Sequence, residues 1–191
     1  MLKPTTMQKK VKFTLVTLWI LFSRSYDAYC TAQLTPDLSK EANPLVTVGG
    51  LGWTPLLLII GALVLYTIYA YYLSVFRKRN LLPAEKGFTF SEVVAYMYLG
   101  EKRSWTAMFY SFPKSLSRFN HYMGHTLTPC VVYAGVVSTL MWLLINYVPA
   151  YRPLHSAPFI YTVLIAGCGV LMLLWNRNMY AVYKQPVADE R

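Results

Sequence analysis

Two charged residues, Arg24 and Asp27, lie three positions apart in an otherwise apolar segment, residues 13–32. On an α-helix this spacing places both side chains on one face together with Ser23 and Thr31. A charged side chain near the centre of a membrane-spanning helix costs roughly 2.5–3.5 kcal/mol on insertion scales, so it needs a partner or a polar cavity. The pair therefore marks the first place to look for function.

Two interpretations of this pair are open. In the first, Arg24 and Asp27 neutralise each other and fasten their helix to neighbouring helices. In the second, they line a polar pocket that opens away from the basic residues of the chain. The candidate catalytic residues of that pocket are Asp27 and Glu41, and the candidate binding residues are Arg24, Thr31, Asn43, Arg152 and His155.

Two carboxylates with an asparagine and a histidine could bind a divalent cation or act as an acid/base pair. None of these residues stands at a recognised ligand spacing. Glu41 and Asn43 also have a simpler interpretation, because both residue types are common in turns and at helix caps. Both alternatives remain open from the sequence.

A weaker metal candidate is the pair His121 and His125, because histidines at positions i and i+4 of a helix can chelate one ion. The glutamate of the H-E-x-x-H motif is absent, since Tyr122 occupies its position. We therefore expect histidines that face the membrane interface, with no metal site and no cofactor.

Four apolar segments must position these residues. Of the 191 residues, 55% are hydrophobic and 14% are charged. Three uncharged runs are long enough to cross about 30 Å of hydrocarbon, and the charged first segment completes a set of four: residues 13–32, 54–76, 128–148 and 158–175. We expect the first segment to be a retained helix rather than a cleaved signal peptide. The sequence thus predicts an all-α integral membrane bundle of four transmembrane helices, with residues 1–191 forming a single domain.

The distribution of basic residues predicts the orientation. The net charge is +10, and 15 of the 18 Lys and Arg residues precede the first span, separate the second span from the third, or follow the fourth. This bias places both termini in the cytoplasm, most simply at a plasma (inner) membrane. Anionic headgroups on that face are the expected partners of the positive charge, and no nucleic acid is required to explain it.

Residues 77–127, between the second and third spans, contain helix signals of their own. Thr89 and Glu92 have the spacing of a capping box, and Gly100 is placed to end the helix that follows. Apolar residues share one face of that helix, which predicts an amphipathic helix on the cytoplasmic membrane surface. Residues 104–112 and 114–127 are candidates for two more such segments.

Part of the chain resembles an uncharacterised family of small prokaryotic polytopic membrane proteins. The resemblance rests on Asp27-x-x-x-Thr31 in the first span and Glu41-x-Asn43-Pro44 in the following loop, about 20 residues in all. Here Cys30 precedes Thr31, and Asp37 to Lys40 replace a glycine-containing turn of the family. The resemblance implies no activity, but it implies that the five motif residues share one local role.

For function, the sequence favours a non-enzymatic membrane protein. The expected role is an accessory or assembly subunit, or a helper in moving a small solute, with a membrane protein partner or a second copy of the chain beside it. The alternative is a small enzyme that acts on a lipid or membrane-bound substrate through an outward site around Asp27 and Glu41. An ion-conducting oligomer is a third possibility.

Overall fold

Within the residues that the structure describes, three helices are long and apolar enough to cross a membrane. They are α3 (Trp53–Phe76, 24 residues), α5 (Leu116–Tyr147, 32 residues) and α6 (Ala157–Lys184, 28 residues). The computed structural model describes residues 5–39, 41 and 43–185, and within them every regular element is helical. This supports the predicted all-α, multi-pass integral membrane protein.

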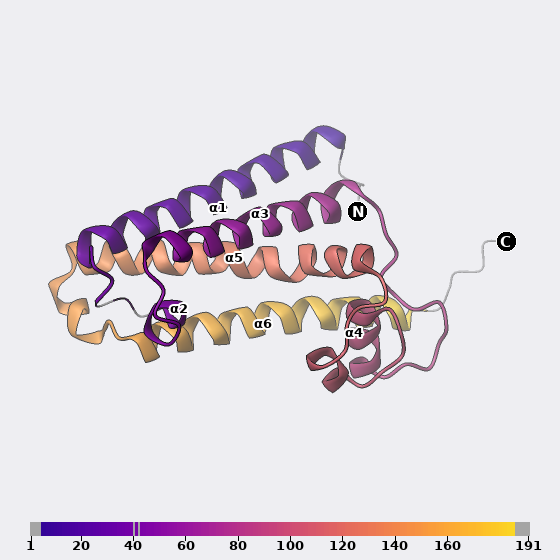
Figure 1. Ribbon diagram of the computed structural model, residues 1–191. Helices are drawn as coiled ribbons and strands as arrows, with labels where there is room; N and C mark the ends of the chain where they lie inside the picture. The colour runs from indigo at the N-terminus through magenta and orange to yellow at the C-terminus, as the bar shows by residue number, and fades with distance from the viewer. Residues whose placement is uncertain (1–4, 40, 42, 186–191) are drawn as a thin grey trace.

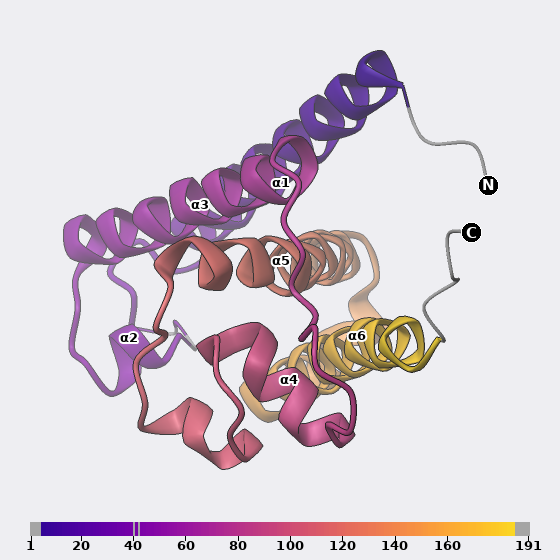
Figure 2. The ribbon, with the colours of Figure 1, turned by 90° about the vertical axis from the view of Figure 1, so that its right-hand side faces the viewer.

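A fourth long helix, α1 (Thr6–Leu34, 29 residues), packs beside α3 and α5 (Figure 1). Viewed along the bundle, α1 and α3 lie on one side of α5 and α6 lies on the other (Figure 2). The remaining elements are short: α2 (Pro44–Thr47), α4 (Phe90–Leu99), η1 (Trp105–Phe109) and η2 (Pro149–Leu154). Helix α5 is therefore the element that every other long helix contacts.

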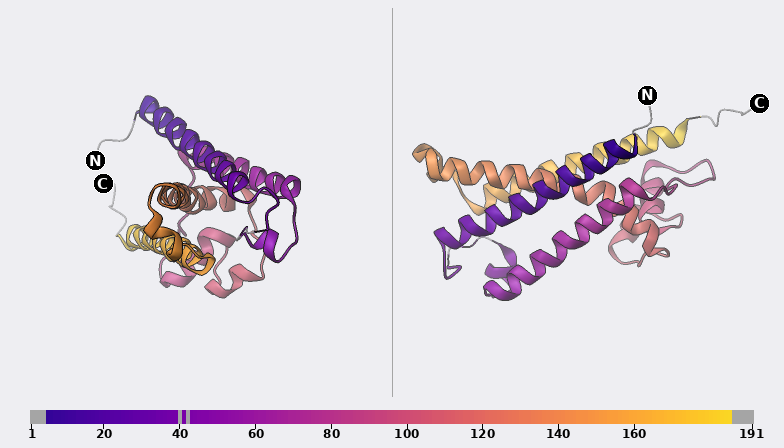
Figure 3. Two further views of the ribbon diagram at one scale, coloured as in Figure 1. Left: turned by 90° about the vertical axis from the view of Figure 1, so that its left-hand side faces the viewer. Right: turned by 90° about the horizontal axis from the view of Figure 1, so that it is seen from above.

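The two ends of the bundle differ in composition. The start of α1, the ends of α3 and α6, and α4 with η1 lie together at one end, which we call the basic end (Figure 1). At the opposite end lie α2 and the link between α5 and α6 (Figure 3). Eight of the chain's Lys and Arg residues lie between the end of α3 and residue 127. The positive charge is therefore concentrated at the basic end.

Small residues allow the long helices to approach α5 closely. A Cβ atom built on Gly124 of α5 would collide with the carbonyl oxygen of Ala70 in α3. A Cβ on Gly135 of α5 would lie 2.9 Å from the Cβ of Ser23 in α1, which is itself fully buried. Where α6 meets α5, the ring of Tyr133 occupies the space that a Cβ on Gly167 would need. Close backbone approach of this kind is a main source of helix association in lipid.

The helix boundaries differ from the prediction at three places, one of which is the end of α6, at Lys184 rather than at residue 175. Residues 114–127 were expected to form a separate surface helix, and this is wrong, because α5 begins at Leu116 and continues without a break to Tyr147. The reason is tertiary, since His121 and Tyr122 are buried among other helices. Similarly, α1 begins seven residues before the predicted span, where the Thr5 hydroxyl accepts from the Gln8 amide and the Gln8 side chain accepts from Thr5 in a capping box.

Helix α4 forms between Thr89 and Gly100, as the capping signals in the sequence predict. The Thr89 side chain and Glu92 cap it reciprocally, and Gly100 ends it with a left-handed φ of 88°. Hydrogen bonds from the Thr89 amide and hydroxyl hold the pKa of Glu92 below its usual value. The apolar face differs from the prediction, because Val93 and Met97 are fully buried against protein rather than lipid. They form a cluster whose other buried members are Leu81, Phe88, Tyr122 and Tyr183.

The close α3–α5 contact predicts the effect of one added methyl group. Gly124→Ala should lower the free energy of unfolding by about 1–3 kcal/mol, because the carbonyl group of Ala70 can move away only if the backbone shifts. The measurement is unfolding of the purified protein in detergent. The matched control is Gly169→Ala in α6, where an added Cβ meets nothing within 4 Å. This variant should have a free energy of unfolding equal to that of the wild type or slightly higher. Equal behaviour of the two variants would contradict this close contact.

Candidate functional site

The Arg24 and Asp27 side chains of α1 face α5 and are held there by hydrogen bonds. Arg24 Nη1 donates to Asp27 Oδ2 at 3.5 Å, and Arg24 Nη2 donates to Ser138 Oγ at 2.7 Å. The other carboxylate oxygen, Asp27 Oδ1, accepts from Trp142 Nε1 at 2.7 Å. The pair therefore forms a network of four side chains that crosses between two helices.

Ser138 and Trp142 can both reach the pair because they lie one helical turn apart on α5. Two more contacts between α1 and α5 lie closer to the basic end. There, Trp19 Nε1 of α1 donates to the carbonyl oxygen of Val132 in α5 at 3.3 Å, and Ser23 packs on Gly135. Residue numbers rise together along both helices, so α1 and α5 run parallel.

This network satisfies most of the polar atoms of the pair. The Arg24 and Asp27 side chains are 22% and 34% exposed, and both carboxylate oxygens accept a hydrogen bond. The Arg24 Nε atom is buried without a hydrogen-bond partner. Since its other two nitrogens are paired, the guanidinium is oriented by α5 and by Asp27.

The loop residues of the candidate site make a turn and a cap. The Glu41 carboxylate accepts from the Asn43 amide at 2.9 Å, and the Asn43 side chain accepts from the Leu45 amide at 3.0 Å. Pro44 then occupies the first position of α2, where its missing amide hydrogen costs nothing. Glu41, Asn43 and Pro44 thus share a local role in starting α2. Thr31 lies elsewhere, in the last turn of α1, where its carbonyl accepts from the Thr35 amide at 2.8 Å.

Sequence reasoning missed two residues of the network, Ser138 and Trp142. A usable signal existed for both, because a serine and a tryptophan one turn apart are donors on one face of an apolar helix.

The two remaining candidates, His155 and Arg152, have different surroundings. His155 lies beside the network, with its ring centroid 6.4 Å from that of Trp142 and its Nδ1 atom 3.4 Å from the Tyr151 hydroxyl. Burial lowers the pKa of His155, which favours the neutral imidazole. Arg152 instead donates from Nε to the carbonyl oxygen of Ile145 at 3.0 Å and is exposed. It therefore caps the end of α5 rather than facing Asp27.

The histidines at positions 121 and 125 have different surroundings. Both ring nitrogens of His121 lie at hydrogen-bonding distance from backbone carbonyls, 2.7 Å from Ser117 O and 3.0 Å from Arg77 O. His125 stacks on Trp175, with the ring centroids 5.3 Å apart. A metal ion on His121 would have to displace one of those carbonyls. Across the part of the chain that the structure describes, no group of three or more His, Cys, Asp or Glu residues could hold a metal ion.

Comparison with known proteins finds no matching family model, no matching curated protein and no matching solved structure. The resemblance carried by Asp27-x-x-x-Thr31 and Glu41-x-Asn43-Pro44 therefore rests on those residues alone. The structure gives these residues different roles. Asp27 contacts α5, whereas Thr31 lies in the last turn of α1 and Glu41 and Asn43 form a turn and a helix cap.

The network predicts how the two charges contribute to stability. Arg24→Gln and Asp27→Asn should each lower the free energy of unfolding by about 1–3 kcal/mol, because each change leaves a partly buried partner unpaired. The double variant should lose less than the sum of the two, which unfolding in detergent would measure. Arg152→Gln is the control, a charge removed from an exposed site at the same end, and should change stability by no more than about 0.5 kcal/mol. A neutral or stabilising Asp27→Asn would contradict a structural pair and favour a ligand site.

Proposed function

We propose that this protein is a four-span membrane protein with a non-enzymatic role as an accessory or assembly subunit. In this proposal α1 is the fourth span, the basic end faces the cytoplasm, and the membrane is the plasma (inner) membrane. The observation that carries the non-enzymatic role is the state of Asp27, whose two oxygens both accept hydrogen bonds within the bundle. These hydrogen bonds hold the carboxylate toward α5, within the bundle.

The length and the surroundings of α1 support its role as a span. Its 29 residues extend about 44 Å, enough to cross a bilayer. Large apolar side chains on its outer surface, among them Leu15, Leu18 and Phe22, are 62%, 57% and 56% exposed and suit a lipid environment. The two charges within its apolar stretch, Arg24 and Asp27, face α5 instead of lipid, as expected for ionisable residues inside a membrane.

An exposed apolar surface at the basic end supports an interaction with a partner. We call it the η1 surface and define it as Trp105, Phe109, Tyr110, Phe112 and Leu116, whose side chains are 52–94% exposed. Exposed apolar patches of this kind mark interaction sites more often than isolated surface residues do. Apart from Leu116, the first residue of α5, the η1 surface lies outside the three apolar helices, so a helix that crosses the hydrocarbon does not account for it. A membrane protein subunit with a matching apolar surface is the proposed partner.

One observation favours the enzyme alternative. Asp27 and Glu41 both lie toward the end opposite the basic end, where two carboxylates could serve an acid/base reaction on a membrane-bound substrate. We place this second because Asp27 and Glu41 both already accept hydrogen bonds.

The four-span topology has a simple consequence for the chain ends. With four spans the two termini lie on the same side of the membrane, whereas three spans put them on opposite sides. A fluorescent reporter that folds only in the cytoplasm should give signal from both an N-terminal and a C-terminal fusion. A fusion after Val48, in the loop before α3, serves as the negative control. Signal from only one terminus would contradict α1 as a span.

The accessory role predicts a complex that depends on the η1 surface. When the protein is extracted from its native membrane in mild detergent, it should migrate as a complex larger than the single chain. Phe109→Ser with Phe112→Ser should release the single chain, because it removes the two most exposed aromatic rings of that surface. The control is Val48→Ser with Leu154→Ser, two exposed apolar residues at the opposite end. A single chain in the wild type, or equal release by both double variants, would overturn the proposal.

A further inference from the structure

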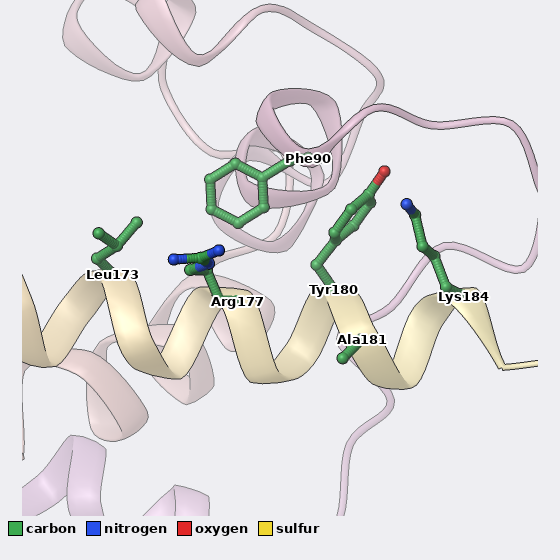
Figure 4. Close-up of a pocket in the computed structure, with 6 residues that line it drawn as sticks. All are labelled: Phe90, Leu173, Arg177, Tyr180, Ala181 and Lys184. Carbon is green, nitrogen blue, oxygen red and sulfur yellow. The ribbon is translucent and has the colours of Figure 1, made fainter.

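A cavity of about 530 Å³ lies between α6 and the start of α4, at the basic end. Figure 4 shows its lining, with Arg177, Tyr180 and Lys184 projecting from α6 beneath Phe90 of α4. Leu173 lies at the end of the row nearer the middle of α6. The cavity thus runs from an apolar side chain to two basic ones along a single helix.

Among the residues that the structure describes, no carboxylate pairs with the two basic residues and competes with an anion for them. Arg177 and Lys184 are seven positions apart, so they share a face two turns apart on α6. Both side chains are exposed, and neither forms an ion pair with a carboxylate of the residues that the structure describes. Lys184 Nζ lies 4.7 Å from the ring centroid of Tyr180. The cavity is therefore positively charged.

Aromatic rings form the wall between the two cations. Tyr180 meets Phe90 edge-to-face, with ring centroids 5.5 Å apart and planes at 75°. This contact joins the first turn of α4 to α6. Tyrosine and other aromatic side chains favour the boundary between hydrocarbon and headgroups, so their presence here is consistent with a cavity at the level of the headgroups.

The α6 surface beyond the cavity is apolar. Val170, Leu173 and Leu174 are 54%, 48% and 52% exposed, and the first charged residue of α6 after them is Arg177. A ligand that fills the cavity would thus meet two positive charges at one end and a hydrocarbon surface at the other. That combination matches an amphiphile with an anionic headgroup rather than a small soluble anion.

We propose that this cavity binds an anionic phospholipid, with its phosphate held by Arg177 and Lys184 and an acyl chain lying along Leu173. Basic pockets beside membrane helices on the cytoplasmic side are suited to such headgroups. The site needs α6 to span the membrane with the basic end at a leaflet that contains anionic lipid. It does not depend on α1 as a span or on a protein partner, so it can fail or succeed separately from the proposed function.

Native mass spectrometry of the full chain in detergent tests this site. Delipidated protein would be titrated with phosphatidylglycerol, with phosphatidylcholine and with inorganic phosphate. We expect phosphatidylglycerol to bind at least about tenfold more tightly than phosphatidylcholine, and phosphate alone not to be retained. Arg177→Ala with Lys184→Ala should weaken phosphatidylglycerol binding about tenfold.

The matched control is Arg77→Ala with Lys78→Ala, which removes one exposed arginine and one exposed lysine from the same end. This variant should bind phosphatidylglycerol as the wild type does. Equal weakening by the two double variants would overturn the site, because it would mean that the basic end binds lipid through diffuse charge. Equal affinity for the two lipids, or retention of phosphate alone, would overturn it as well. If the double variant does not fold, Arg177→Gln alone should show a smaller loss in the same direction.

Discussion

The charged pair on α1 can remain in apolar surroundings only while α5 supplies hydrogen-bonding partners for it. Ser138 binds the guanidinium and Trp142 binds the carboxylate, at 2.7 Å in each case. These bonds require the two helices to lie parallel and in one register, since a shift of one turn would separate both pairs. The position of α1 therefore follows from the chemistry of two residues rather than from hydrophobicity alone.

The same constraint explains the central position of α5. Lipid provides no hydrophobic driving force between membrane helices, so association depends on close packing and polar contacts. Helix α5 combines both, with Gly124 and Gly135 allowing close approach of α3 and α1, and Tyr133 packing on Gly167 of α6. Its long extension at the basic end adds His121, which lies at hydrogen-bonding distance from the carbonyl of the residue that caps α3. One helix thus organises the contacts of the other three.

The two ends of the bundle have different chemistry. At one end Asp27 and Trp142 belong to a small polar network whose hydrogen bonds join α1 to α5. At the basic end, exposed cations and the η1 surface remain available to other molecules.

Local sequence signals determined much of this protein. The apolar runs predict α3 and α6 to within one residue at their starts, and Thr89, Glu92 and Gly100 delimit α4. These features succeed because each depends on residues close together in the chain. The spacing of Arg24 and Asp27 also indicated that the two would interact.

Only the tertiary structure decided the partners of that pair and the course of residues 114–127. Ser138 and Trp142 lie 114 and 115 positions from the residues that they bind, a separation that no local pattern encodes. Residues 116–127 became part of α5, and the apolar face of α4 turned toward Tyr122 and Tyr183, because packing between helices outweighed the tendency of each segment to lie on a membrane surface. Periodicity shows which face of a helix is apolar, but whether protein or lipid covers that face depends on the rest of the fold.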